Sequence, residues 1–178
     1  SCDLETMGFF PWYPDKDIVT VAFTAEPKTS HVLYLGPQPA PVELDPSGAL
    51  YTQLVWLFTS PRVKLRLANG KFDMLWIRQK WGIECTNFTF DTMLAGTLLD
   101  ENRSNSLSNH TKTLTDMGGY DLQFDATHEK GAMERIPATE PLLEYAGGDT
   151  DATQRVADVL RHSLLEDTQL TPVSYTHL

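Results

Sequence analysis

Three short groups of residues have the types and spacing that divalent-cation chemistry requires. Asp3 and Glu5 lie two positions apart, and residues two apart in a β-strand project from the same face. Tyr145 and Asp149 lie four apart, which places both on one face of a helix. Asp73 lies between these groups, where a predicted strand is followed by a helix. Carboxylate oxygens alone select Mg²⁺ or Mn²⁺ over Zn²⁺.

Each group has a plainer interpretation when it is considered alone. Asp3 and Glu5 could end a solvated strand, because Asp-x-Glu is frequent in an acidic chain. Asp73 could be a first-turn acid that complements the helix dipole. Tyr145 could be a core aromatic residue and Asp149 a surface acid.

Two glycines favour a site over a plain helix face at the third group. Gly147 and Gly148 precede Asp149, and each glycine costs roughly 1 kcal/mol in a helix interior. This cost predicts that another part of the chain approaches the helix closely there. Asp149 also shares a helix face with Val156, which is predicted to point at the sheet, and an acid on a buried face needs a partner.

The overall charge limits the way in which nucleic acid could bind. The chain has 14 lysines and arginines against 24 acids, for a net charge of −10. Sequence-independent duplex binding usually depends on a basic surface, which this balance disfavours. Two bare carboxylates about 4 Å apart repel by about 4 kcal/mol at an effective dielectric constant of 20. A cluster of acids would therefore need cations or raised pKa values.

Other chemistries find little support in the composition. Cys2 and Cys85 are the two cysteines, so neither a disulfide framework nor a zinc site is expected, and a reducing compartment is the default. No apolar run approaches the roughly 20 residues of a membrane span. Four histidines show no ligand spacing and are interpreted as surface or loop residues: His31, His110, His128 and His162.

The elements that must position the acids follow from the apolar patterning. Strands are predicted at residues 1–5, 18–25, 31–35, 63–68 and 85–90. Helices are predicted at residues 50–60, 71–81, 92–99, 107–117 and 139–167, with Asp91 and Thr139 as N-caps. Residues 26–30 are predicted to form a turn, and residues 36–48 and 118–137 to form loops.

This order predicts one α/β domain, because a strand hairpin is followed by alternating helices and strands. The sheet is expected to be mixed and flanked by helices. The domain is expected to span residues 1–168, with its first strand truncated because only the second half of a typical strand is present. Residues 169–178 break the helical pattern and are interpreted as a non-native tail.

The three groups together resemble a known family. Their order is Asp-x-Glu, then Asn-x-x-Phe-Asp at 69–73, then Tyr-x-x-x-Asp, which resembles the DEDD exonucleases with the tyrosine variant of the third motif. The segment DTMLAGTLLDENRSNSL at 91–107 is similar to the corresponding part of family A, polymerase I-like DNA polymerases. The resemblance covers residues 1 to about 166. It implies a ribonuclease H-like fold and a proofreading 3′–5′ exonuclease domain.

The resemblance also implies a mechanism, two-metal phosphodiester hydrolysis with Mg²⁺ or Mn²⁺. Asp3 would bridge both ions, and Glu5 and Asp149 would complete the site of the first. Asp73 would hold the second ion, partly through water. Tyr145 would orient the attacking water.

Substrate contacts are implied at five positions. Asn69 and Phe72 match family positions near the terminal nucleotides, and Phe9 lies where such domains place an apolar wedge. Thr6 follows directly after the first two acids. Arg103 lies in a basic segment without acids that could line the path of a single strand or could be a solvated helix face.

The expected partners are a single-stranded DNA 3′ end and a polymerase domain downstream in the full-length chain. The expected setting is intracellular, cytoplasmic, and bacterial or phage-like. Two alternatives remain at this point. One is a ribonuclease D-like 3′–5′ exoribonuclease, and the other is a catalytically inactive exonuclease fold kept as a structural module.

Overall fold

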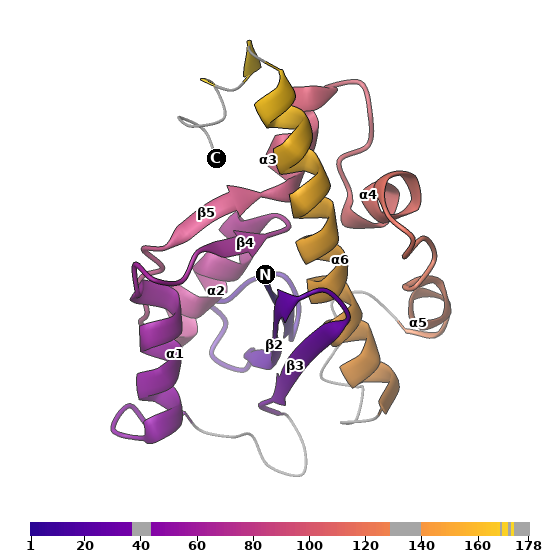
Figure 1. The fold of residues 1–178 in the computed structure, drawn as a ribbon. Helices are drawn as coiled ribbons and strands as arrows, with labels where there is room; N and C mark the ends of the chain where they lie inside the picture. The colour runs from indigo at the N-terminus through magenta and orange to yellow at the C-terminus, as the bar shows by residue number, and fades with distance from the viewer. Residues whose placement is uncertain (37–43, 129–139, 168, 171, 173–178) are drawn as a thin grey trace.

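The computed structural model describes residues 1–36, 44–128, 140–167, 169–170 and 172. This part of the chain forms five strands and six helices (Figure 1). In chain order they are β1 (Cys2–Thr6), β2 (Ile18–Glu26), β3 (Thr29–Tyr34), α1 (Ala49–Thr59), β4 (Leu65–Leu67), α2 (Gly70–Trp81), β5 (Phe88–Asp91), α3 (Thr92–Leu99), α4 (Leu107–Leu114), α5 (Leu122–Thr127) and α6 (Glu140–Glu166). The predicted α/β class is confirmed.

The strands form one antiparallel and one parallel group. β1, β2 and β3 pair antiparallel in that order, and β4 pairs parallel with β5. β4 also contacts β1, although no hydrogen-bonded ladder joins the two groups among the described residues. Glu5 is paired with Thr20 of β2. β1 therefore has β2 on one side, while its other side faces β4 and the start of α2.

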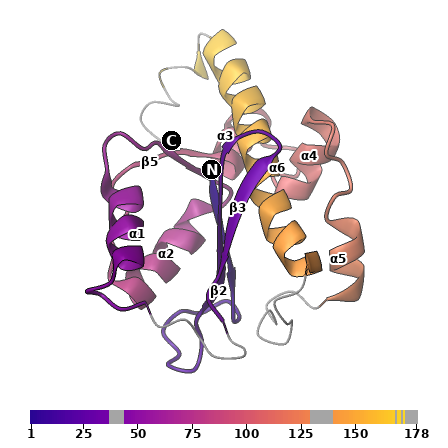
Figure 2. The same cartoon turned by 60° about the horizontal axis from the view of Figure 1, so that its bottom comes forward.

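Helices cover both faces of the three-stranded sheet. Figure 2 shows this sheet nearly edge-on, with α1 and α2 on one side and α5 and α6 on the other. Leu4 packs in the core that includes Phe58 of α1 and Trp76 of α2. Because side chains alternate along a strand, Asp3 and Glu5 point to the opposite face, which α6 covers.

Most predicted elements agree with the structure, and one does not. The strand predicted at 18–25 is β2, and the helix predicted at 71–81 is α2. The prediction of a loop at 118–137 is wrong in its first half, because α5 forms there and buries Phe124 against Val19 and Leu142. Residues 129–139, including the predicted N-cap Thr139, lie outside the described residues, as do residues 37–43 of the first predicted loop and most of the predicted tail. None of the described helices has the length and hydropathy of a membrane span.

The interpretation of His110 as a surface or loop residue is also wrong. His110 lies on α4 with only 6% of its surface exposed, because α4 packs on α3 where Gly96 has no side chain. A Cβ at Gly96 would lie 2.4 Å from Nε2 of His110. Burial lowers the pKa of the imidazole, so His110 is a neutral packing residue.

Gly96→Ala is therefore expected to destabilise the domain by about 1–3 kcal/mol, the range for overpacking a closed site. The free energy of unfolding in urea would measure the cost. The control is the same substitution in a His110→Ala background, where the added methyl group meets no ring and the cost should largely disappear. An equal cost in both backgrounds would contradict the contact.

Candidate active site

The first two acids are fixed by their strand. Asp3 and Glu5 lie on β1, where Asp3 is partly buried and Glu5 is 7% exposed. Asp3 is paired with Ala22 of β2 and Glu5 with Thr20, and this register fixes the position of both acids along the sheet. The two carboxylates project from one face of β1, as the spacing predicts.

The start of α2 is held by an acid from another element. Asn69 adopts a left-handed conformation, with φ 61° and ψ 44°, which asparagine tolerates better than most residues. The carboxylate of Asp91 accepts hydrogen bonds from the backbone N–H groups of Asn69 at 3.3 Å and Gly70 at 2.8 Å. Asp91 is also the N-cap of α3, as predicted, and accepts from Met93 N at 2.8 Å. One buried carboxylate thus fixes where two helices begin.

Asp73 reaches the site from the first turn of α2. The side chain is 3% exposed, and its Oδ1 accepts a hydrogen bond of 3.2 Å from the backbone N–H of Leu4. That N–H lies between Asp3 and Glu5 on β1. The contact therefore ties the second acidic group to the first, across the side of β1 that β2 does not occupy.

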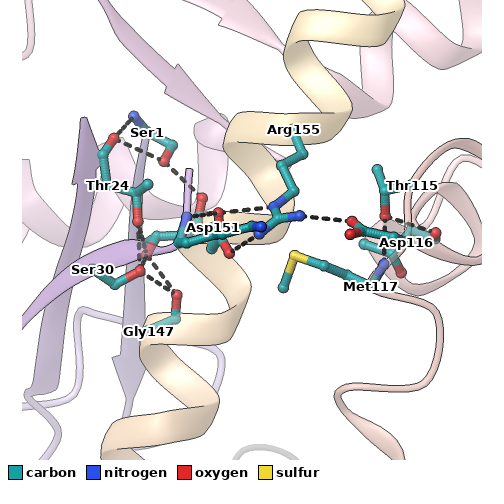
Figure 3. Close-up of polar contacts among 12 residues, drawn as sticks. Ser1, Thr24, Ser30, Thr115, Asp116, Met117, Gly147, Asp151 and Arg155 are labelled. Atoms are coloured by element: carbon teal, nitrogen blue, oxygen red, sulfur yellow. Dashed lines mark hydrogen bonds and ion pairs between the residues drawn. The ribbon is translucent and has the colours of Figure 1, made fainter. Parts of the chain in front are cut away.

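A network of hydroxyl groups holds α6 against the sheet. The hydroxyl of Ser30 donates to the carbonyl of Gly147 at 2.7 Å (Figure 3). The hydroxyl groups of Thr24 and Thr150 are 2.8 Å apart. A Cβ at Gly147 would lie 3.3 Å from that of Ser30. The close approach that the two glycines predict is therefore present, and it brings Asp149 over β1.

Three carboxylates meet in the assembled site. Asp3, Glu5 and Asp149 each offer an oxygen, and these oxygens all lie within 4.8 Å of one another. Asp73 is not a member of this group, but its charge acts on Asp3. The donors are all oxygen atoms, and this set suits Mg²⁺ or Mn²⁺. The residues therefore fit the expected metal site.

Burial and the crowding of the acids raise the pKa values of Asp3 and Asp73. Burial raises the pKa of Asp3 well above its usual range, and the charges of Asp149, Asp73 and Glu5 raise it further. Burial likewise raises the pKa of Asp73 to about 8, against the opposing effect of its backbone hydrogen bonds. The metal-free site therefore retains protons on some of its carboxyl groups near neutral pH.

Tyr145 lies one turn before Asp149 on α6. Its ring stacks on Phe124 of α5, with centroids 4.1 Å apart and planes at 14°, which fixes its orientation. Burial and the charge of Asp149 raise the pKa of Tyr145 above its usual value. The hydroxyl therefore remains protonated and can act as a hydrogen-bond donor.

A second tyrosine contacts the site and was not predicted from the sequence. The hydroxyl of Tyr120 donates to Oδ1 of Asp149 at 2.5 Å. Burial and Asp149 raise the pKa of Tyr120 as well. Tyr120 lies in the segment predicted as a loop, and its one local signal is the preceding pair Gly118-Gly119, which marks a turn.

The five residues expected to contact substrate differ in their exposure and in their neighbours. Asn69 and Phe72 line a pocket of about 510 Å³ beside α2, and Phe9 is 61% exposed in the connection between β1 and β2. Thr6 is buried, and its hydroxyl donates to the carbonyl of Gly8 at 2.7 Å. Arg103 is exposed and pairs with Asp100 at 3.3 Å.

Solved structures share this architecture. NrnC of Brucella melitensis bound to pGG aligns with a TM-score of 0.73 at 19% identity, over 99% of this chain and 78% of that chain. The same protein with bound Mg²⁺ aligns with a TM-score of 0.70 at 20% identity, over 98% and 77%. A structure of the POL domain of Pol1 from M. smegmatis, in complex with DNA primer-template and dNTP, aligns with a TM-score of 0.62 at 18% identity, over 90% and 23%. The fold is the ribonuclease H-like fold of nucleases.

The sequence comparison gives the family. Residues 1–165 match the family model described as 3′-5′ exonuclease, so the chain belongs to the 3′–5′ exonuclease family. The DNA polymerase of Bacillus phage SP01 is 35% identical over 94 residues, which are 51% of this chain and 10% of the phage protein. The chain therefore matches a small part of the length of that relative. The expected class, an exonuclease domain of the DEDD type, is confirmed.

Proposed function

We propose that this chain is the 3′–5′ exonuclease domain of a polymerase I-like DNA polymerase and removes nucleotides from DNA 3′ ends, as a proofreading nuclease does. The observation that carries the proposal is the meeting of Asp3, Glu5 and Asp149 within 4.8 Å. The similarity to a phage DNA polymerase and the fold shared with Pol1 support a polymerase domain as partner in the same protein. The substrate is a single-stranded DNA 3′ end.

The proposed cofactors are two divalent cations, Mg²⁺ or Mn²⁺. Asp3, Glu5 and Asp149 would hold one ion, and Asp3 with Asp73 would hold the other. When bound, such ions activate a water molecule and stabilise the oxygen that leaves during phosphodiester hydrolysis. The raised pKa of Asp3 supports the assignment. The neighbouring carboxylates repel one another, and bound cations would offset this repulsion. NrnC, which shares the fold, has a structure with bound Mg²⁺.

Tyr145 is the proposed orienting residue for the attacking water. Its stacked ring holds the hydroxyl one helical turn from Asp149, and its raised pKa keeps the proton on the oxygen. A hydroxyl of this kind can donate to water or to a phosphate oxygen and cannot act as a general base near neutral pH. Its contribution is therefore positional.

The single strand of DNA would approach the acids along two surfaces. One is the pocket of Asn69 and Phe72, where an amide and an aromatic ring could contact the terminal nucleotides. The other is the connection between β1 and β2, where Phe9, Trp12 and Tyr13 are each half exposed or more. Aromatic rings bind single strands by stacking on bases, at roughly 1–3 kcal/mol per base. Thr6 and Arg103 complete the proposed set of contacts.

The direct test is digestion of 5′-labelled single-stranded DNA and RNA by the full chain, with Mg²⁺ and with a chelator. The expected result is a ladder of DNA products that shorten from the 3′ end and are absent in the chelator. A 3′-blocked DNA is the control for internal cleavage. The likeness to NrnC bound to pGG favours a second candidate, an exonuclease that acts on RNA, and faster RNA digestion would establish it in place of the first.

Tyr145→Phe is expected to lower the single-turnover rate by about 10- to 100-fold, or about 1.4–2.7 kcal/mol of barrier. The substitution removes one orienting hydroxyl and leaves all four carboxylates in place. The control is Tyr34→Phe, since the buried hydroxyl of Tyr34 has no hydrogen-bond partner among the described residues. A Tyr145→Phe protein with the parental rate would remove Tyr145 from the mechanism.

A further inference from the structure

Asp149 is held by a side chain that the family motif does not contain. The hydroxyl of Tyr120 donates a 2.5 Å hydrogen bond to Oδ1 of Asp149. The ring of Tyr120 packs directly on α6 at Gly148. A Cβ at Gly148 would lie 2.9 Å from Cδ2 of Tyr120. Gly148 is thus the position that lets the ring of Tyr120 reach Asp149. Gly147, by contrast, contacts Ser30 on β3, so the two glycines serve different neighbours.

The segment that carries Tyr120 is itself anchored to α6. Figure 3 shows Arg155 of α6 reaching Asp116, between α4 and α5, with a contact of 2.6 Å. Arg155 is fixed in turn by Asp151, at 2.8 Å and 3.0 Å. The backbone N–H of Tyr120 donates to the carbonyl of Met117 at 3.2 Å.

Gly119 completes the turn before Tyr120. Its φ of 89° is a conformation that glycine adopts without the strain that a side chain would bring. Turn geometry and the Arg155 ion pair therefore help to place the hydroxyl of Tyr120 against Asp149. A contact with both ends fixed in this way is suited to orienting a carboxylate.

We propose that Tyr120 is a positioning residue that fixes the carboxylate of Asp149 in the orientation needed to hold a divalent cation with Asp3 and Glu5. The inference rests on the proposed function, since it assigns a partner to one of the proposed metal ligands. Carboxylates that bind metals are commonly held by further hydrogen bonds, and the loss of such a partner typically weakens metal affinity by about 10- to 100-fold. Tyr145 would orient the attacking water, and Tyr120 would orient the metal-binding carboxylate of Asp149.

The test uses Tyr120→Phe in the full chain and measures Mn²⁺ binding by the loss of the electron paramagnetic resonance signal of free Mn²⁺. The dissociation constant for Mn²⁺ is expected to rise about 10-fold or more. The Mg²⁺ concentration for half-maximal exonuclease rate should rise in parallel, while the rate at saturating Mg²⁺ stays within about threefold of the parent. Gly148→Ala, which displaces the ring of Tyr120, should give the same shift.

The matched control is Tyr51→Phe, which removes a hydroxyl that donates to the carbonyl of Trp81 at 2.8 Å. Tyr51 lies on α1, which is on the side of the sheet opposite α6 (Figure 2). The control substitution should cost stability and leave Mn²⁺ affinity unchanged. Parental Mn²⁺ affinity in Tyr120→Phe would overturn the inference, as would a lower saturated rate with unchanged affinity, because the hydroxyl would then act on the substrate. A parent that binds no Mn²⁺ would instead overturn the proposed function.

Discussion

Asp3→Ala is expected to lower the exonuclease rate at least on the order of 10³-fold, which corresponds to about 4 kcal/mol of barrier. Asp3 lies on β1 within 4.8 Å of both Glu5 and Asp149, and its carboxylate is the one that would be shared by both proposed ions. Single-turnover digestion of 5′-labelled single-stranded DNA would measure the loss. Asp45→Ala is the control, because Asp45 is an exposed acid that contacts Ser47 in the turn before α1.

The same substitution should change the response of stability to metal. Removal of Asp3 relieves repulsion among the carboxylates, so in chelator the variant should melt at the same temperature as the parent or higher. Mg²⁺ should then stabilise the parent more than the variant, because an ion that binds only the folded form stabilises it in proportion to occupancy. Equal responses to Mg²⁺, or full activity in the variant, would mean that these acids form no metal site.

In the absence of divalent cations, the domain is expected to lose stability as the pH rises from about 5 to about 8. The pKa of Asp73 is raised to about 8 in the folded state, against about 3.9 for an unfolded aspartate. The folded protein therefore binds more protons than the unfolded chain in this window, and stability falls by up to about 1.4 kcal/mol per pH unit for each such carboxyl group. Asp3 acts in the same direction. Chemical denaturation in chelator would measure the slope.

The control for this prediction is Asp73→Asn, which removes one of the titrating groups without a large change in shape. The slope of stability against pH should be smaller for Asp73→Asn than for the parent. Ser1 and His110, whose pKa values are lowered by burial, change stability in the opposite direction. Their contribution is the same in both proteins, so it cancels when the two slopes are subtracted. Saturating Mg²⁺ should flatten the parental slope, since the ions hold the carboxylates ionised. A parental slope that equals that of Asp73→Asn would show that Asp73 is ionised in the metal-free protein.

The pairing of residues within each group could be predicted because it depends on local periodicity, whereas the meeting of the groups in one site was implied by the family resemblance. The two-residue period of β1 places Asp3 and Glu5 on one face, and the helical period of α6 places Tyr145 and Asp149 on another. The glycines before Asp149 likewise indicated a close neighbour, and Ser30 and Tyr120 occupy that place.

Contacts between distant segments could not be predicted in this way. His110 shows no local sign of burial, because its environment is created by Gly96 in the preceding helix. Tyr120 reaches Asp149 through packing between distant segments, since α4 and α5 lie against α6 and Asp116 between them pairs with Arg155. α5 was missed because a single aromatic residue, Phe124, supplies most of its burial.

The docking of α6 has a consequence for the order in which the protein matures during synthesis. Among the described elements β1 is synthesised before the other strands and helices, whereas Tyr145 and Asp149 lie on α6, which follows them. Contacts between segments so far apart in the chain form late, since loop-closure entropy opposes them until the intervening elements have folded. A nascent chain that has not yet docked α6 has Asp3 and Glu5 in place but an incomplete ligand set. The candidate metal site is therefore completed only when α6 docks, late in the folding of the domain.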